Sequence, residues 1–143
     1  MASFAKSNYH CRPDQKTPIE AAARPLGGAR ILVVDDEFLI TAQIECDLSE
    51  AGAEVVGPAQ TLDDALALAE REIVSAAVID IQLGRDHVGP LAQQLSDRGI
   101  PFVFYTGQTH TDPIRAQWPT SKVISKPATA AKLIATVAAL LKR

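Results

Sequence analysis

The chain has 143 residues, of which 47% are hydrophobic and 22% charged, and it carries a formal net charge of -3 at pH 7. These values are typical of one globular domain, and the acidic balance argues against nonspecific binding of DNA or RNA. The N-terminus lacks the apolar core of a signal peptide, no stretch is long enough for a membrane span, and Cys11 and Cys46 form no metal or redox motif. We therefore expect a cytoplasmic protein that binds neither nucleic acid nor membrane.

Residues 1–28 contain three prolines and the pair Gly27-Gly28, with little apolar periodicity. Such a composition favours a flexible tail over a packed element. From residue 29 to residue 143 the chain alternates between two regular patterns. We therefore predict a flexible N-terminal tail over residues 1–28 and a single domain over residues 29–143.

Five short stretches rich in β-branched or aromatic residues predict strands, at residues 30–35, 53–59, 75–80, 101–106 and 121–126. Between them, apolar residues recur every three or four positions, which predicts helices. The apolar faces of four helices are Ile40, Ile44, Leu48 and Ala51; Leu62, Leu66, Ala69 and Ile73; Val88, Leu91 and Leu95; and Leu133, Val137 and Leu141. Thr61 is the expected N-cap of the second helix, and Gly99 the expected end of the third.

The segment between the fourth and fifth strands has a weaker pattern. Asp112-Pro113 favours the start of a helix, but Pro119 ends it within two turns. Few apolar residues in the segment from Gln108 to Pro119 could hold it against a core. We predict a short or irregular fourth helix in a segment with little apolar anchoring.

The repeated alternation of strand and helix predicts an α/β fold with a five-stranded parallel sheet, doubly wound and covered by helices on both faces. In such sheets, ligands bind outside the carboxyl ends of the strands. The residues that end the strands are therefore the candidates for a site. They are Asp35 and Asp36 after the first strand, Asp80 after the third, Thr106 and Gly107 after the fourth, and Lys126 and Pro127 after the fifth.

Asp35, Asp36 and Glu37 follow the first strand side by side. Like charges this close repel one another unless a cation lies among them, and hard oxygen ligands favour Mg²⁺. A strand-end aspartate beside such an ion and a lysine ammonium favours phosphoryl chemistry, in which the carboxylate attacks phosphorus. Each residue alone has a plainer explanation, such as a helix N-cap for Asp36 or a turn at Thr106-Gly107. Their joint placement at four strand ends favours a functional site.

Four motifs, "VVDDE", "VIDIQLG", "YTG" and "ISKP", occur in an order and spacing that resemble the receiver domain of two-component response regulators. The resemblance covers about residues 29–143. It implies a flavodoxin-like sheet with strand order 2-1-3-4-5. It also implies that Asp80 is the phosphoacceptor, that Thr106 and Lys126 bind the phosphoryl group, and that the Lys126–Pro127 bond is cis. The implied ligands of Mg²⁺ are Asp36, Asp80 and the backbone carbonyl of Gln82 directly, and Asp35 through water.

The stretch "PFVFYTGQ" is similar to a narrower subgroup, stand-alone receivers with the motif Pro-Phe-x-Phe-Ala-Thr-Gly-Tyr, some of which act in bacterial stress signalling. Tyr105 replaces the alanine of that motif, and Gln108 replaces its tyrosine. Many receivers also carry an aromatic switch residue three positions before the lysine, where this chain has Val123. Tyr105 cannot stand in for it, because successive side chains of a strand point to opposite faces. We expect phosphorylation to reorder residues 108–119 instead.

The resemblance implies a single-domain response regulator that accepts a phosphoryl group on Asp80 from a sensor histidine kinase or a phosphotransfer protein. The chain ends about one helix after Lys126, so we expect no output domain. Signalling would then pass to a protein target by contact, by phosphorelay, or by draining phosphate from a kinase. We expect a monomer or weak homodimer, and no enzymatic activity beyond its own phosphorylation and dephosphorylation.

Two other functions fit parts of the pattern. A pseudo-receiver would act as an interaction module without phosphorylation, although every site residue of a receiver is present. A phosphatase similar to the haloacid dehalogenases would also use a strand-end aspartate and Mg²⁺. That family has Asp-x-Asp after its first strand, which "DDE" does not supply.

Overall fold

The computed structural model describes residues 24–84, 86–107, 114–119 and 121–142. A five-stranded parallel sheet runs through the middle of the molecule, in the order β2-β1-β3-β6-β7. Its strands are β1 (Arg30–Val34), β2 (Glu54–Ala59), β3 (Ala76–Ile79), β6 (Phe102–Thr106) and β7 (Lys122–Ser125). The predicted α/β fold and the strand order that the resemblance implied are confirmed.

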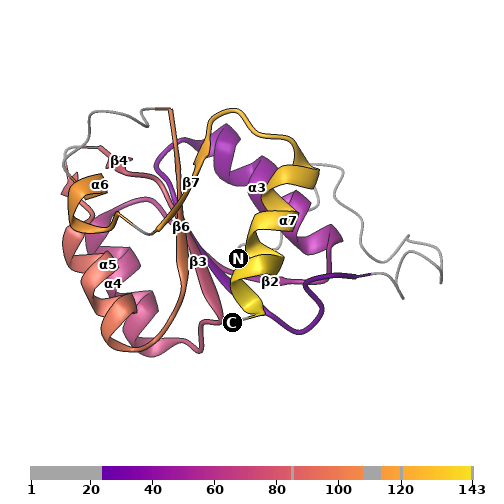
Figure 1. Ribbon diagram of the computed structural model, residues 1–143, viewed down its shortest axis with the longest axis horizontal. Coiled ribbons are helices and arrows are strands. Elements are labelled where there is room, and N and C mark those ends of the chain that lie inside the picture. The colour runs from indigo at the N-terminus through magenta and orange to yellow at the C-terminus, as the bar shows by residue number, and fades with distance from the viewer. Residues whose placement is uncertain (1–23, 85, 108–113, 120, 143) are drawn as a thin grey trace.

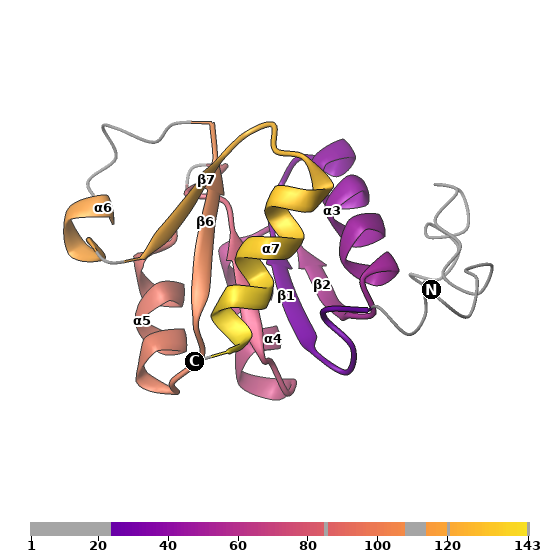
Figure 2. The same cartoon turned by 45° about the vertical axis from the view of Figure 1, so that its right-hand side comes forward.

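Helices cover both faces of the sheet (Figure 1). On one face lie α4 (Leu62–Arg71), α5 (Gly89–Asp97) and the four-residue α6 (Ile114–Gln117). On the other lie α3 (Phe38–Glu50) and α7 (Ala130–Leu141), side by side in Figure 2. The short fourth helix is thus confirmed, whereas residues 108–113 before it lie outside the described residues. None of the helices in the described part of the chain has both the length and the apolar character needed to span a membrane.

The sheet divides the apolar core into two clusters because successive side chains of a strand point to opposite faces. Leu32 and Phe104 belong to the cluster under α4 and α5. Val33 and Val103, their neighbours in the chain, belong to the cluster under α3 and α7. This burial on both faces explains why the central strands are continuous apolar runs.

Local signals in the sequence set several element boundaries. The Thr61 hydroxyl accepts a hydrogen bond from the Asp64 amide at 3.1 Å, so the predicted N-cap of α4 is present. Gly57 has a φ of +97° at an irregularity in the pairing of β1 with β2. A Cβ there would lie 2.8 Å from the Ala59 nitrogen, which requires glycine.

Two local expectations were wrong. Ile73, assigned to the apolar face of the second helix, is 78% exposed, because α4 ends at Arg71 and Glu72 is already extended. Leu26, assigned to the tail, is 1% exposed and packs in the cluster under α3 and α7, with its amide bonded to the Ala51 carbonyl. The remainder of the predicted tail, residues 1–23, lies outside the described residues.

A two-residue antiparallel pair, β4 (Gln82–Leu83) with β5 (Asp86–His87), follows β3 and has no counterpart in the sequence prediction. It encloses Gly84, whose φ is +59°. Leu83 is fully buried in the cluster under α4 and α5. The pair therefore fixes the chain directly after Asp80.

Candidate functional site

Backbone hydrogen bonds hold the candidate residues at the carboxyl edge of the sheet. The Asp35 amide donates to the Ala59 carbonyl at 3.0 Å, and the Asp80 amide donates to the Val34 carbonyl at 2.8 Å. The Lys126 amide donates to the carbonyl of Thr106, the last residue of β6, at 2.9 Å. Each bond extends the pairing of neighbouring strands by one step, so the positions of these residues follow from the register of the sheet.

Three carboxylates gather at this edge. One oxygen from each of Asp35, Asp36 and Asp80 lies within 4.8 Å of the others. The side chains differ in burial, since Asp35 is 1% exposed and Asp80 4%, whereas Asp36 is exposed. The helix N-cap is Glu37, and no side chain caps it, so Asp36 does not serve as the N-cap of α3.

The ammonium group of Lys126 neutralises part of this negative charge. Its Nζ lies 2.9 Å from Asp35 Oδ2, 3.1 Å from Asp80 Oδ2 and 2.7 Å from Glu37 Oε1. The carboxylates of Glu37 and Asp35 raise the pKa of Lys126 above its ordinary value, against the opposing effect of burial. Lys126 therefore stays charged at neutral pH.

The carboxyl group of Asp80 ionises less readily than an ordinary aspartate. Burial, followed by the negative charge of Asp35, raises its pKa to about 6. Two smaller effects lower the pKa of Asp80. They are the charge of Lys126 and a hydrogen bond from the Gln82 amide to Asp80 Oδ1 at 3.1 Å. Both shifts are compatible because Lys126 is shared among three carboxylates and offsets only part of the repulsion between Asp35 and Asp80.

The geometry suits a hard divalent cation. Asp35 Oδ2 is buried, and Lys126 Nζ lies 2.9 Å from it. Carboxylate oxygens are ligands that Mg²⁺ prefers, and three of them meet here within 4.8 Å of one another. The Gln82 backbone lies beside Asp80, and the role of its carbonyl as a further ligand stays a prediction.

Thr106 and Val123, which occupies the position of the usual aromatic switch residue, lie on the neighbouring strands β6 and β7. Thr106 is buried at the end of β6, and Val123, half-buried on β7, is in register with Phe104. The Lys126–Pro127 peptide is cis, as the resemblance implied. The structure thus brings Asp35, Asp36, Asp80, Thr106 and Lys126 to one edge, while their chemical roles stay predictions.

Glu37 and Tyr105 both contact Lys126, and the sequence analysis predicted neither contact. Glu37 binds Lys126 across 89 positions of the chain. The Tyr105 hydroxyl accepts a hydrogen bond from the Ala128 amide, and its ring centre lies 5.9 Å from Lys126 Nζ. The run "DDE" indicated a third carboxylate near the cation, but no local pattern indicates which lysine a side chain will meet.

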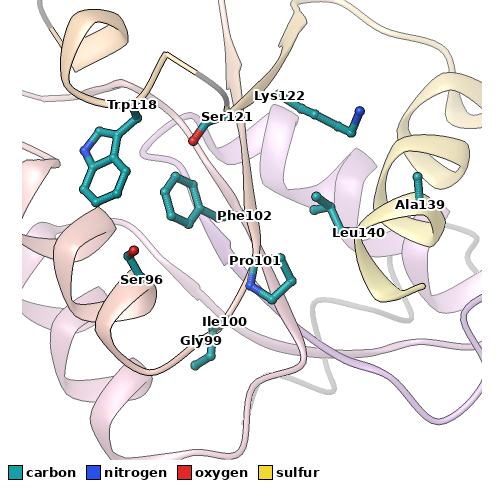
Figure 3. A pocket seen from close by; sticks show the side chains of 10 residues that line it. All are labelled: Ser96, Gly99, Ile100, Pro101, Phe102, Trp118, Ser121, Lys122, Ala139 and Leu140. Atoms are coloured by element: carbon teal, nitrogen blue, oxygen red, sulfur yellow. The ribbon is translucent and has the colours of Figure 1, made fainter. Parts of the chain in front are cut away.

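A separate cleft of about 470 Å³ lies at the opposite end of β6 and β7 (Figure 3). Trp118 and Phe102 line one part of it, and Leu140 of α7 lines another. None of the candidate residues at the carboxyl edge lines this cleft. The cleft is therefore separate from the carboxylate cluster and Lys126.

Known structures resemble this chain throughout the domain. It is 28% identical to a response regulator receiver protein from Sinorhizobium medicae, with a TM-score of 0.70 over 80% of this chain and 94% of that one. It is 35% identical to SdrG from Sphingomonas melonis, with a TM-score of 0.69 over 79% and 96%. It is 28% identical to the response regulator PhyR from Brucella abortus, with a TM-score of 0.68, and it covers 51% of that chain while 85% of its own length is matched. No protein-family model and no curated protein matches it.

Fold, strand order and these similarities agree. The chain belongs to the receiver domains of response regulators. It spans about half the length of PhyR. Membership of the narrower Pro-Phe-x-Phe-Ala-Thr-Gly-Tyr subgroup stays a prediction.

Proposed function

We propose that Asp80 accepts a phosphoryl group from a phosphohistidine of a sensor histidine kinase or of a phosphotransfer protein. The observation that supports this most directly is the environment of the Asp80 carboxylate. It lies 3.1 Å from the Lys126 ammonium and belongs to the same cluster as Asp35 and Asp36. The phosphorylated domain would then signal to a protein target by contact, by onward phosphotransfer, or by draining phosphate from a kinase.

The chemistry requires an ionised Asp80. An oxygen lone pair of the carboxylate forms the new bond to phosphorus, while the bond from phosphorus to the histidine nitrogen breaks and its electron pair returns to the imidazole. With a pKa of about 6, Asp80 is mostly a carboxylate at neutral pH. The Lys126 ammonium stabilises the negative charge on the transferring oxygens, and the Thr106 hydroxyl donates to one of them.

Asp35, Asp36, Asp80 and the Gln82 carbonyl would hold Mg²⁺ at this edge. When bound, the ion neutralises charge on the phosphoryl oxygens. The ion would also relieve the repulsion among Asp35, Asp36 and Asp80, which the Lys126 ammonium offsets only in part.

A small phosphodonor tests the proposal. The full chain is incubated with phosphoramidate and Mg²⁺, and its intact mass is measured with time. We expect the mass to rise by one phosphoryl group in the wild type, with no rise in Asp80→Asn and no rise when EDTA is present. Asn keeps the volume of the side chain, so the substituted protein should retain the fold, which its circular dichroism checks.

Labelling of a different residue, or labelling that EDTA does not affect, would contradict the assignment of Asp80 and the role of the metal. If the folded wild type gains no phosphoryl group at all, the chain acts instead as an interaction module without phosphorylation.

A further inference from the structure

Tyr105 lies next to Thr106 in β6 but faces the other side of the sheet. It is 5% exposed and packs in the cluster under α3 and α7, together with Ile124 and Leu133. A buried tyrosine normally requires a hydrogen-bond partner for its hydroxyl. The partner of the Tyr105 hydroxyl lies two residues after Lys126 of the candidate site.

The partner is the backbone of the loop that carries Lys126. The amide of Ala128 donates to the Tyr105 hydroxyl at 3.1 Å. Ala128 lies two residues after Lys126 and directly before Thr129, the N-cap of α7. The loop between β7 and α7 is therefore bonded to a side chain of β6.

Residues 105 and 106 thus hold the backbone on both sides of the Lys126 side chain. The Lys126 amide donates to the Thr106 carbonyl at 2.9 Å, and the Ala128 amide donates to Tyr105. Two such bonds close together restrict the path of the loop, which sets the direction in which Lys126 leaves the backbone. That side chain is 12% exposed and reaches all three of its carboxylate partners.

The ring of Tyr105 adds a second contact with the same lysine. Its centre lies 5.9 Å from Lys126 Nζ, at the outer limit of a cation–π interaction. A tyrosine that served only to fill the core would not need to meet both the loop backbone and the ammonium group. The two contacts converge on one residue.

We propose that Tyr105 is a positioning residue for Lys126, and that it aids phosphorylation by holding the Lys126 ammonium at the Asp80 carboxylate. This inference rests on the proposed function, because it concerns the same reaction. Under this proposal, the tyrosine that this chain has in place of the alanine of the Pro-Phe-x-Phe-Ala-Thr-Gly-Tyr motif has a functional role.

Tyr105→Phe removes the hydroxyl and keeps the ring. We measure the initial rate of phosphoramidate labelling of Asp80 in the full chain, over a series of Mg²⁺ concentrations. At saturating Mg²⁺ we expect the rate to fall about three- to tenfold, the range expected for the loss of one hydrogen bond. The Mg²⁺ concentration for half-maximal rate should change less than about twofold, because Tyr105 contacts none of the carboxylates.

Thr129→Val is the matched control. It also removes a side-chain oxygen that accepts from a backbone amide near the start of α7, in this case Lys132, at 3.1 Å. It leaves Ala128 and Lys126 untouched, so its labelling rate should stay within about twofold of the wild type. An equal fall in both variants would mean that any loosening of this loop slows labelling, and the inference would be wrong.

A double-mutant cycle with Lys126→Gln separates positioning from a general structural effect. If Tyr105 acts through Lys126, Tyr105→Phe should have no further effect on labelling once the ammonium is absent. The inference would be wrong if Tyr105→Phe lowered the labelling rate by the same factor with Lys126 and with Lys126→Gln. It would also be wrong if Tyr105→Phe alone kept the wild-type rate. Either result would leave Asp80 as the phosphoacceptor. A wild-type chain that is not labelled at Asp80 would instead overturn the proposed function, and this inference with it.

Discussion

At the scale of single residues, the Lys126 ammonium joins carboxylates that would otherwise repel one another. It meets Asp35 and Glu37 from the chain after β1 and Asp80 from the chain after β3. The buried pairs with Asp35 and Asp80 add little net stability, because desolvation offsets most of the attraction. Their main consequence is for the pKa of Asp80, which burial and the charge of Asp35 raise and the Lys126 ammonium lowers.

The raised pKa of Asp80 predicts a pH dependence of stability in the metal-free protein. The folded state holds the Asp80 proton up to a pH of about 6, whereas the unfolded chain releases it near 3.8. Asp80 therefore contributes stability that is fully present below pH 4 and is lost as the pH rises through 6. Relative to Asp80→Asn, the free energy of unfolding of the wild type should fall by about 2 to 3 kcal/mol over this interval.

Urea unfolding of both proteins in EDTA, from pH 4 to pH 7, measures this difference. Titrations of groups distant from Asp80 are common to both proteins and largely cancel. A difference that stays constant, or that grows in favour of the wild type as the pH rises, would show that burial and Asp35 do not control Asp80. Lys126 does not add to the effect in this range, because its raised pKa matters only at alkaline pH.

At the scale of elements, α6 is better anchored than the sequence indicated. Ile114 is fully buried in the cluster under α4 and α5. The ring of Trp118 packs edge-to-face on Phe102, with centroids 5.7 Å apart. The expectation of little apolar anchoring was therefore wrong for residues 114–119. The expected response of this segment to phosphorylation stays a prediction, and its first half lies outside the described residues.

Trp118 is the only tryptophan of the chain, so its fluorescence reports on the end of α6. If phosphorylation shifts α6, the indole should lose part of its contact with Phe102 and its emission should move to longer wavelength. The measurement compares emission before and after labelling with phosphoramidate, with the labelled fraction determined by intact mass. Asp80→Asn, treated in the same way, should show no shift.

Unchanged emission from fully labelled protein would contradict a movement of α6. The response would then have to pass through other elements. The contact between Tyr105 and the loop before α7 is one route, because it leads to the opposite face of the sheet.

At the scale of the whole molecule, the turn before β1 is part of the domain. Leu26 is enclosed among Ile31, Leu48 and other members of the cluster under α3 and α7. Leu26→Ala should lower the free energy of unfolding by about 2 to 5 kcal/mol, because it removes buried methyl groups and leaves a cavity. Urea unfolding of the full chain measures this loss.

Ile73→Ala is the matched control, since it removes a comparable side chain from an exposed position. Its effect should stay within about 0.5 kcal/mol of zero. Equal effects of the two substitutions would mean that Leu26 does not belong to the core in solution, and that the domain begins later in the chain.

The positions of the strands and main helices could be predicted because they depend on periodic patterns of apolar residues. The predicted strand at residues 75–80, for example, became β3 at Ala76–Ile79. Leu26 could not be predicted, because a single apolar residue among prolines and glycines has no period. The pair β4–β5 was missed for a similar reason, since two residues are too few to show alternation.

The candidate site also has a part that the sequence predicts and a part that it does not. The sequence alone predicted that Asp35, Asp36, Asp80, Thr106 and Lys126 lie together, because each ends or closely follows a strand and the carboxyl ends of parallel strands lie along one edge. It did not identify the contacts of Lys126 with Glu37 or of Tyr105 with Ala128, which join residues 89 and 23 positions apart. The local pattern gives the face to which a side chain points. The partner that it meets there depends on the packing of elements that are distant in the chain, and so becomes known only in the folded domain.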